Sequence, residues 1–330
     1  MKNIKNLKII GIGLLVFALA LGFSAVNVSA QDGKPRVGAV LKTLSNPFWV
    51  AMQQGLVAGA NEYGIQLDIT AVPTEQDLDQ QLNQLETMLL RDYDALLVSP
   101  ISSTNLIPGL RKASEQDIPI VDLDGNLPPE QAKEHDIDVY SSISSNNYKA
   151  GQKAAEHMID VLDGEGKVIA VQGVAGNVTG ETRVRGFKET INEKSPNIEI
   201  VGEFAGDWSR NKTANITMDA LTANPDLDGI YCANDTMALG AVEIVFSRDK
   251  EDQVTVIGTD GNSAARDSIL DGRLDASVGQ LPYLMGKMAI ETANKIINGE
   301  EVPGTQDVPT LFMTKEVLEE GEHELLQYVR

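Results

Sequence analysis

Short apolar segments alternate with amphipathic stretches along almost the whole chain, and this alternation limits the possible folds more than any other feature. Nine segments have the length of buried strands: 37–41, 67–71, 95–98, 118–123, 168–171, 198–201, 229–232, 254–257 and 276–278. Continuous apolar strands separated by helices are typical of parallel sheets covered on both faces. Because 330 residues suit two cores better than one, the pattern predicts an α/β fold of two doubly wound parallel-sheet lobes.

The clearest predicted helix covers 75–91, with Thr74 as its N-cap. Four leucines repeat at helical spacing along one face of it, at positions 78, 82, 85 and 89. A second helix is expected over 281–297, followed by an apolar piece at 308–313. The sequence contains no linker rich in Pro, Gly or Ser between the two halves.

The first thirty residues have the layout of a secretory signal peptide. Three lysines precede an apolar run over 9–23, and the small residues Val28-Ser29-Ala30 close the segment. A membrane anchor is the alternative, but this run is shorter than the roughly 20 residues that a spanning helix needs. We therefore expect cleavage near Ala30, with export to the periplasm.

Charge and cysteine content exclude two classes of protein. The formal net charge is -21, and no basic run follows residue 35, so a nucleic-acid partner is not expected. Cys232 is the only cysteine, which rules out an internal disulfide. We expect it to act as a small buried apolar residue.

Polar and aromatic side chains gather just after the predicted strands. They include Lys42, Asn46, Phe48, Trp49, Asp124, Arg183, Trp208, Asn234, Asp260 and Gln280. In open parallel sheets, ligands bind beyond the carboxyl ends of the strands. We therefore expect these side chains to form one site, although each alone could be a helix cap, a loop acid or a core residue.

The composition of this set favours a sugar. Aromatic rings cover the apolar faces of a sugar ring, while carboxylates, amides and guanidinium groups pair with hydroxyls. Lys42 and Arg183 balance Asp124 and Asp260, so the set as a whole favours an uncharged ligand.

Several motifs in this order resemble the ribose/allose class of periplasmic sugar-binding proteins, and within it the allose-binding branch in particular. They are the segments 42–49, 175–183, 207–208, 231–240, 258–261 and 279–280. This resemblance covers essentially all of the chain after the signal peptide. It implies a type I periplasmic binding protein fold, with two lobes joined by three hinge strands and a sugar held between them.

The resemblance also implies the lobe boundaries and the roles of the residues. The N-terminal lobe would comprise 36–145 and 281–309, and the C-terminal lobe 146–280 and 310–330. All ten side chains named above would bind the sugar, with Asn46, Phe48, Trp49 and Asp124 from the first lobe. The partners implied are a monosaccharide, the membrane permease of an ABC importer and a chemoreceptor, with the protein itself a monomer and without a cofactor.

Two positions favour a hexose over ribose. Lys42 matches the allose-binding members, where the ribose-binding members have Ser, and Gly125 stands where those members have an Arg that contacts the ligand. D-Ribose, D-psicose and a related small polyol or signal molecule remain alternatives. Asn146 replaces the usual Asp beside a hinge crossing, and residues 316–330 extend beyond the family's usual end.

Other functions have weaker support in the sequence. A glycosidase could use Asp124 and Asp260, but both are expected beside cations that keep them ionised, whereas a general acid needs a raised pKa. The chain lacks a zinc motif, a nucleophile elbow and a phosphate loop. The start of a calcium loop at 122–126 is not completed, because Leu127 replaces the required Gly. A sugar-sensing repressor would carry an N-terminal helix-turn-helix, which this chain lacks.

Overall fold

The computed structural model describes residues 33–127 and 129–329. The predicted signal peptide and its cleavage near Ala30 lie outside the described residues. In the part of the chain that is described, no helix has both the length and the apolar character needed to cross a membrane.

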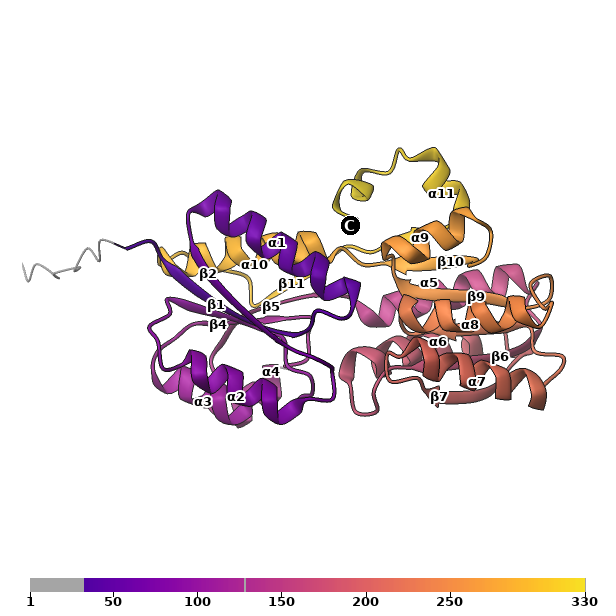
Figure 1. Ribbon diagram of the computed structural model, residues 1–330, viewed down its shortest axis with the longest axis horizontal. Coiled ribbons are helices and arrows are strands. Elements are labelled where there is room, and N and C mark those ends of the chain that lie inside the picture. Colours follow the sequence, from indigo (N-terminus) through magenta and orange to yellow (C-terminus); the bar gives the residue numbers. More distant parts are fainter. Residues whose placement is uncertain (1–32, 128, 330) are drawn as a thin grey trace, which may run out of the picture. The chain divides into compact units, whose positions relative to one another are not determined.

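The first sheet has six parallel strands in the order β11-β5-β4-β3-β1-β2. These strands are β1 (Arg36–Thr43), β2 (Gln66–Val72), β3 (Ala95–Val98), β4 (Ile120–Leu123), β5 (Val139–Ser145) and β11 (Thr305–Val308). Helices α1 (Pro47–Tyr63) and α10 (Pro282–Ile297) pack together on one face, while α2 (Leu78–Met88) and α3 (Ile107–Glu115) cover the other face (Figure 1). The short helix α4 (Pro129–Glu134) precedes β5.

The second sheet has the order β12-β10-β9-β8-β6-β7, and only the pairing of β10 with β12 is antiparallel. Its strands are β6 (Gly166–Gln172), β7 (Ile198–Ala205), β8 (Gly229–Cys232), β9 (Thr255–Asp260), β10 (Ala276–Gly279) and β12 (Leu311–Met313). Its helices are α5 (Asn147–Val161), α6 (Val178–Lys194), α7 (Arg210–Ala223), α8 (Asp235–Ser247) and α9 (Ser263–Leu270). Helix α5 packs against α6, and α7 packs against α8.

The chain passes from one sheet to the other three times. The passages follow β5, β10 and β11. At the third passage, Pro309 interrupts the apolar piece 308–313, so that Val308 ends a strand of one sheet and Leu311 begins a strand of the other. The predicted fold class, two parallel-sheet lobes with covering helices, is confirmed.

The predicted helix over 75–91 is wrong at its start. The helix begins at Leu78 after Asp77, and Thr74 does not cap it. Instead, the backbone N–H and the Oγ1 of Thr74 both donate to Oδ2 of Asp77, at 2.8 and 2.7 Å. This local bonding closes a turn over residues 74–77, which leaves Glu75 outside the helix.

Asn146, the position that departs from the family pattern, is the N-cap of α5. Its Oδ1 accepts a hydrogen bond from the backbone N–H of Lys149 at 3.0 Å. Asparagine caps a helix as well as aspartate does, so the substitution is compatible with the local geometry beside the first passage between the sheets.

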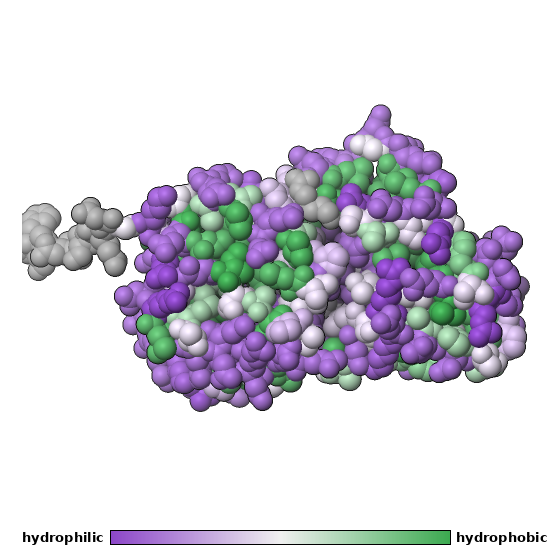
Figure 2. All heavy atoms as spheres, viewed as in Figure 1, coloured by the Kyte–Doolittle hydropathy of each residue, from purple (hydrophilic) through white to green (hydrophobic). Residues whose placement is uncertain are grey.

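The C-terminal extension is ordered against the rest of the protein. Helix α11 (Lys315–Glu320) packs on α9 (Figure 1). The 3₁₀ helix η1 (Glu324–Tyr328) contacts α10. Val329 is buried. The face drawn in Figure 2 is mainly polar, with hydrophobic side chains gathered over α1 and near α9.

Candidate functional site

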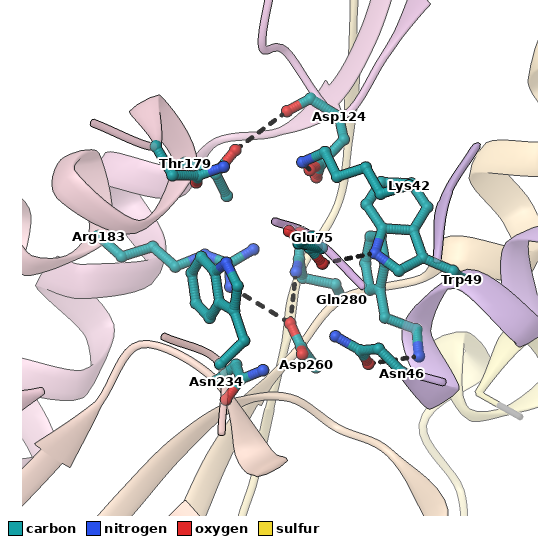
Figure 3. Close-up of a pocket in the computed structure, with 13 residues that line it drawn as sticks. Lys42, Asn46, Trp49, Glu75, Asp124, Thr179, Arg183, Asn234, Asp260 and Gln280 are labelled. Carbon is teal, nitrogen blue, oxygen red and sulfur yellow. Dashed lines mark hydrogen bonds and ion pairs between the residues drawn. The ribbon is translucent and has the colours of Figure 1, made fainter. Parts of the chain in front are cut away.

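A small cavity, with about 290 Å³ of space that includes some open solvent, lies where strands of both sheets end. Its walls are formed by Lys42, Asn46, Phe48, Trp49, Glu75, Asp124, Asn177, Thr179, Arg183, Trp208, Asn234, Asp260 and Gln280. All ten side chains predicted from the sequence are therefore brought together. Figure 3 labels all of them except Phe48 and Trp208. Its lining mixes charged, amide, hydroxyl and aromatic side chains, which is the chemistry of a site for a small polar ligand.

Aromatic rings of the first lobe line one wall of the cavity. Asn46 is the N-cap of α1 and accepts the N–H of Phe48, which fixes the first turn of the helix at the cavity. The rings of Phe48 and Trp49 meet edge to face, with centroids 4.9 Å apart. Nζ of Lys42 lies 4.9 Å from the centroid of the Trp49 ring, within the range of a cation–π contact.

Trp208 supplies an aromatic ring from the second lobe, and glycines make room for it. Asp207 and Trp208 have positive φ angles of 53° and 58°. A Cβ atom on Gly173 would lie 1.9 Å from the Trp208 ring, and one on Gly180 would lie 2.9 Å from it. Gly173 and Gly180 therefore leave the space that this indole occupies.

Two buried ion pairs hold opposite charges in the cavity. Nζ of Lys42 lies 3.0 Å from Oδ2 of Asp124, and Nη1 of Arg183 lies 3.3 Å from Oδ1 of Asp260. Arg183 also donates to the carbonyl of Ala233 at 2.7 Å. Gln280 Nε2 donates to Oδ1 of Asp260 at 2.8 Å.

The sequence predicts that the cation beside Asp260 sets the pKa of this carboxyl group, and the structure does not agree. Burial raises the pKa of Asp260 to about 6, although the charge of Arg183 and the hydrogen bond from Gln280 both act to lower it. The cost of desolvating the carboxylate therefore exceeds the attraction of the guanidinium group.

Four buried polar atoms on the cavity wall have no hydrogen-bond partner among the described residues. They are Asp124 Oδ1, Trp208 Nε1, Asn234 Nδ2 and Gln280 Oε1. Two of them are donors and two are acceptors. Because unpaired buried polar groups are costly, this set favours a ligand that can donate and accept, as hydroxyl groups do.

Asn234 combines the two roles between which the sequence left a choice. Its Oδ1 caps α8 by accepting the N–H of Met237 at 2.9 Å. Its Nδ2 is the unpartnered donor on the cavity wall. Helix capping and a place in the site therefore do not exclude each other.

Three lining residues were missed in the sequence: Glu75, Asn177 and Thr179. Glu75 brings a third carboxyl group, so the predicted balance of two cations and two carboxylates is incomplete. Burial raises the pKa of Glu75, while Lys42 and the hydrogen bond from Trp49 oppose this shift. The third carboxyl is thus held closer to its neutral form than an exposed glutamate would be.

Asn177 and Thr179 join the two lobes across the site. Thr179 Oγ1 donates to Oδ1 of Asn126 at 2.9 Å and lies 3.3 Å from the carbonyl oxygen of Asp124. Asn177 Nδ2 donates to the carbonyl of Ile101 at 3.3 Å. These bonds run from the first turn of α6 to loops of the first sheet, so the structure has the lobes in contact over the cavity.

Metal ligation has no geometric support in the part of the chain that the structure describes. There, no group of three or more His, Cys, Asp or Glu side chains is arranged to hold a metal ion. Asp122 and Asp124, which begin the incomplete calcium loop, instead bond to Ser142 and Lys42 respectively.

Comparison with known proteins identifies the family. Residues 37–301 match the periplasmic binding protein domain, and the chain belongs to this family. The D-allose-binding periplasmic protein of Escherichia coli is 35% identical over 283 residues, which cover 84% of this chain and 91% of that protein. The ribose import binding protein RbsB of Bacillus subtilis is 32% identical over 279 residues, covering 84% and 87% of the two chains.

A solved structure shares the same arrangement. The periplasmic solute-binding protein of an ABC transporter from Actinobacillus succinogenes, solved with bound D-allose, superposes with a TM-score of 0.83 at 32% identity. The match covers 87% of this chain and all of the other. The type I periplasmic binding protein fold expected from the sequence is thus confirmed.

Proposed function

We propose that this protein is the solute-binding component of an ABC sugar importer and binds one neutral monosaccharide between its two lobes. The observation that carries the proposal is the set of four unpartnered donors and acceptors, which come from both lobes and surround a small cavity flanked by indole rings. Polar atoms placed in this way satisfy a polyhydroxy ring and are left unpaired without one.

A D-allose-like hexose is the ligand we favour. The relatives named above include binding proteins for D-allose and for ribose. Lys42, whose ammonium group reaches the cavity, is the sequence feature that separates the two branches. D-Ribose, D-psicose and a related small polyol or signal molecule are the alternatives.

Binding would work by hinge closure. We propose lobes of 36–145 with 281–309 and of 146–280 with 310–330, which separate and close about the three passages between the sheets. A sugar that contacts both lobes stabilises only the closed form, and so shifts the population towards it. The closed form would be recognised by the importer's permease and by a chemoreceptor, each binding a monomer in the periplasm after signal peptide removal near Ala30.

A thermal-shift panel of aldoses, ketoses and polyols tests this proposal directly. A ligand present at 100 times its dissociation constant should stabilise the protein by about 2.7 kcal/mol, which raises the melting temperature measurably. Titration calorimetry then gives the affinity. The absence of a shift with every sugar would contradict the proposal.

The glycosidase alternative is tested with the same protein. The raised pKa of Asp260 is one property that a general acid needs. We propose that the protein is not an enzyme, because ion pairs and hydrogen bonds hold its cavity carboxylates at fixed partners. Release of a sugar from aryl glycosides by purified protein would overturn this.

A further inference from the structure

Glu75 is held in a fixed position at the cavity by its surroundings. The turn over residues 74–77 is closed by the hydrogen bonds from Thr74 to Asp77. Thr43 Oγ1 anchors the start of this turn by donating to the carbonyl of Pro73 at 2.8 Å. Trp49 Nε1 donates to Oε1 of Glu75 at 3.1 Å, and Figure 3 shows this bond beside the cavity.

The carboxyl group of Glu75 keeps one oxygen for a ligand. Oε1 is engaged by Trp49, whereas Oε2 has no hydrogen bond from the described residues. The charged groups that act on this carboxyl include Lys42, Asp124, Arg183 and Asp260. Lys42 and Arg183 are each already paired with an aspartate, so neither is committed to Glu75.

Glu75 also lines a second cavity, next to the one described above, which is here called the inner cavity. This second cavity, here called the outer chamber, has about 780 Å³ of space, part of it open solvent, and is lined by residues of both lobes. It is lined by Thr43, Ser45, Asn46, Thr74, Glu75, Gln76, Val174, Asp207, Trp208, Ser209 and Thr236. Asn46, Glu75 and Trp208 line both cavities. Glu75 therefore lies at the boundary between the inner cavity and the outer chamber.

The other cavity walls leave a ligand little room to extend. Gln280 lies beside the passage from β10 to α10, where its backbone N–H donates to the carbonyl of Asp260 at 2.9 Å. Thr179 and Asn177 bridge the lobes over another side. The outer chamber, which is reached past Glu75, Asn46 and Trp208, is therefore the space into which a substituent on a bound ring can extend.

We propose that Glu75 is a specificity-determining residue, which accepts a hydrogen bond from the hydroxyl of an exocyclic arm pointing towards the outer chamber. The inference rests on the proposed function, because it needs a sugar ring in the inner cavity. This hydrogen bond to Glu75 favours aldohexoses with a terminal hydroxymethyl group over two other kinds of sugar. These are 6-deoxyhexoses, which lack the hydroxyl, and aldopentoses, which lack the whole arm. A hydrogen bond to a carboxylate is stronger than one between neutral groups, so this contact discriminates well.

The test compares matched sugars that differ only in this hydroxyl. Titration calorimetry would use D-allose with 6-deoxy-D-allose, and D-galactose with D-fucose, on wild type and on Glu75→Ala, Glu75→Gln and Gln76→Ala. Of D-allose and D-galactose, the one that wild type binds more tightly should bind at least tenfold more tightly than its own 6-deoxy form. Glu75→Ala should reduce this ratio to within twofold. Gln76→Ala, which changes the next residue in the outer chamber only, should keep the wild-type ratio.

Glu75→Gln separates a direct contact from an effect on Trp49. The amide oxygen of the glutamine can still accept the indole N–H of Trp49. If the affinity ratio between the aldohexose and its 6-deoxy form falls in both Glu75 variants, the preference is therefore due to the carboxylate itself. A preference that survives in Glu75→Ala, or is lost in Glu75→Ala but fully kept in Glu75→Gln, would overturn the inference. Wild type that binds other sugars but not these pairs also contradicts it, whereas wild type that binds no sugar at all overturns the proposed function as well.

Discussion

Oδ2 of Asp124 accepts a hydrogen bond from Nζ of Lys42 at 3.0 Å, while Oδ1 of the same carboxylate faces the cavity without a partner among the described residues. Both side chains are buried. One carboxylate thus neutralises a buried lysine and still offers an acceptor to a ligand. The pair lies within the first lobe, so it forms whether or not the lobes close.

Asp124→Asn should weaken both the fold and sugar binding. The asparagine keeps the shape but leaves Lys42 buried opposite a neutral amide. Because an uncompensated buried charge is costly, we expect the free energy of unfolding to fall by up to about 3 kcal/mol. Sugar affinity should fall at least tenfold. Urea unfolding and titration calorimetry measure the two effects separately.

The double variant Lys42→Met/Asp124→Leu is the control for this prediction. Removing both charges avoids the unpaired ion, so stability should return to within about 1 kcal/mol of wild type. Sugar binding should remain lost. A double variant that binds sugar with wild-type affinity would remove Lys42 and Asp124 from the ligand site.

Thr179→Val should shift the lobes away from the closed form. The substitution removes the hydroxyl that bonds to Asn126 across the cleft and leaves that amide oxygen unpaired. We expect sugar affinity to fall about three- to tenfold, which corresponds to a net hydrogen bond of about 1 kcal/mol. Small-angle scattering with and without sugar should show a larger open fraction at subsaturating ligand.

Thr190→Val is a matched control on the same helix. Thr190 is buried like Thr179, but its Oγ1 has no hydrogen-bond partner among the described residues, and it does not line the cavity. Its replacement should leave affinity unchanged. Equal losses for the two variants would mean that the effect of Thr179→Val comes from helix α6 and not from closure.

Gly173→Ala should displace the indole of Trp208. The added methyl group would lie 1.9 Å from that ring, far inside van der Waals contact. We expect at least a tenfold loss of sugar affinity and a smaller change in tryptophan fluorescence on sugar addition. Gly304→Ala, where a Cβ atom meets nothing within 4 Å, should leave both unchanged. Wild-type binding by Gly173→Ala would contradict a stacking role for Trp208.

Sequence could predict the members of the site that lie directly after strands. Asp124 comes immediately after β4, and Asp260 ends β9. Because parallel strands of a sheet end at the same edge, the polar residues at the carboxyl ends of the strands locate one wall of the site in each lobe. Their continuous apolar composition makes most strands recognisable in the sequence. The exceptions are β5, which is rich in serine, and β11, in which only Val308 is buried.

The remaining members depend on geometry that no local pattern encodes. The sequence predicts Glu75 on the first turn of an amphipathic helix. The bonds from Thr74 to Asp77 form a turn there instead, and the Glu75 carboxyl group accepts from Trp49. The hydrogen bond from Thr179 to Asn126 forms only when the second lobe contacts the first. Contacts between lobes are set by the hinge and cannot be read from either partner alone.

Asp122 should make the protein less stable as the pH rises. This side chain is fully buried, with Oδ2 accepting from Ser142 at 2.6 Å and Oδ1 without a partner among the described residues. Burial raises its pKa to about 8 from an ordinary value of 3.8. The folded state therefore holds a proton that the unfolded state has lost, and stability falls as the pH rises from about 4 to about 8.

Asp122→Asn removes this dependence, because the amide does not titrate. Relative to wild type, the variant should gain up to about 1.4 kcal/mol of unfolding free energy per pH unit between pH 5 and pH 8, measured by urea unfolding. Asp68→Asn is the control, since Tyr93 and Arg36 lower the pKa of Asp68 and both states are already ionised in this range. The free energy of unfolding that Asp68→Asn loses should therefore be constant between pH 5 and pH 8. Parallel stability curves for wild type and Asp122→Asn would show that Asp122 is ionised in the folded protein throughout, with Lys42 and the Ser142 hydroxyl outweighing its burial.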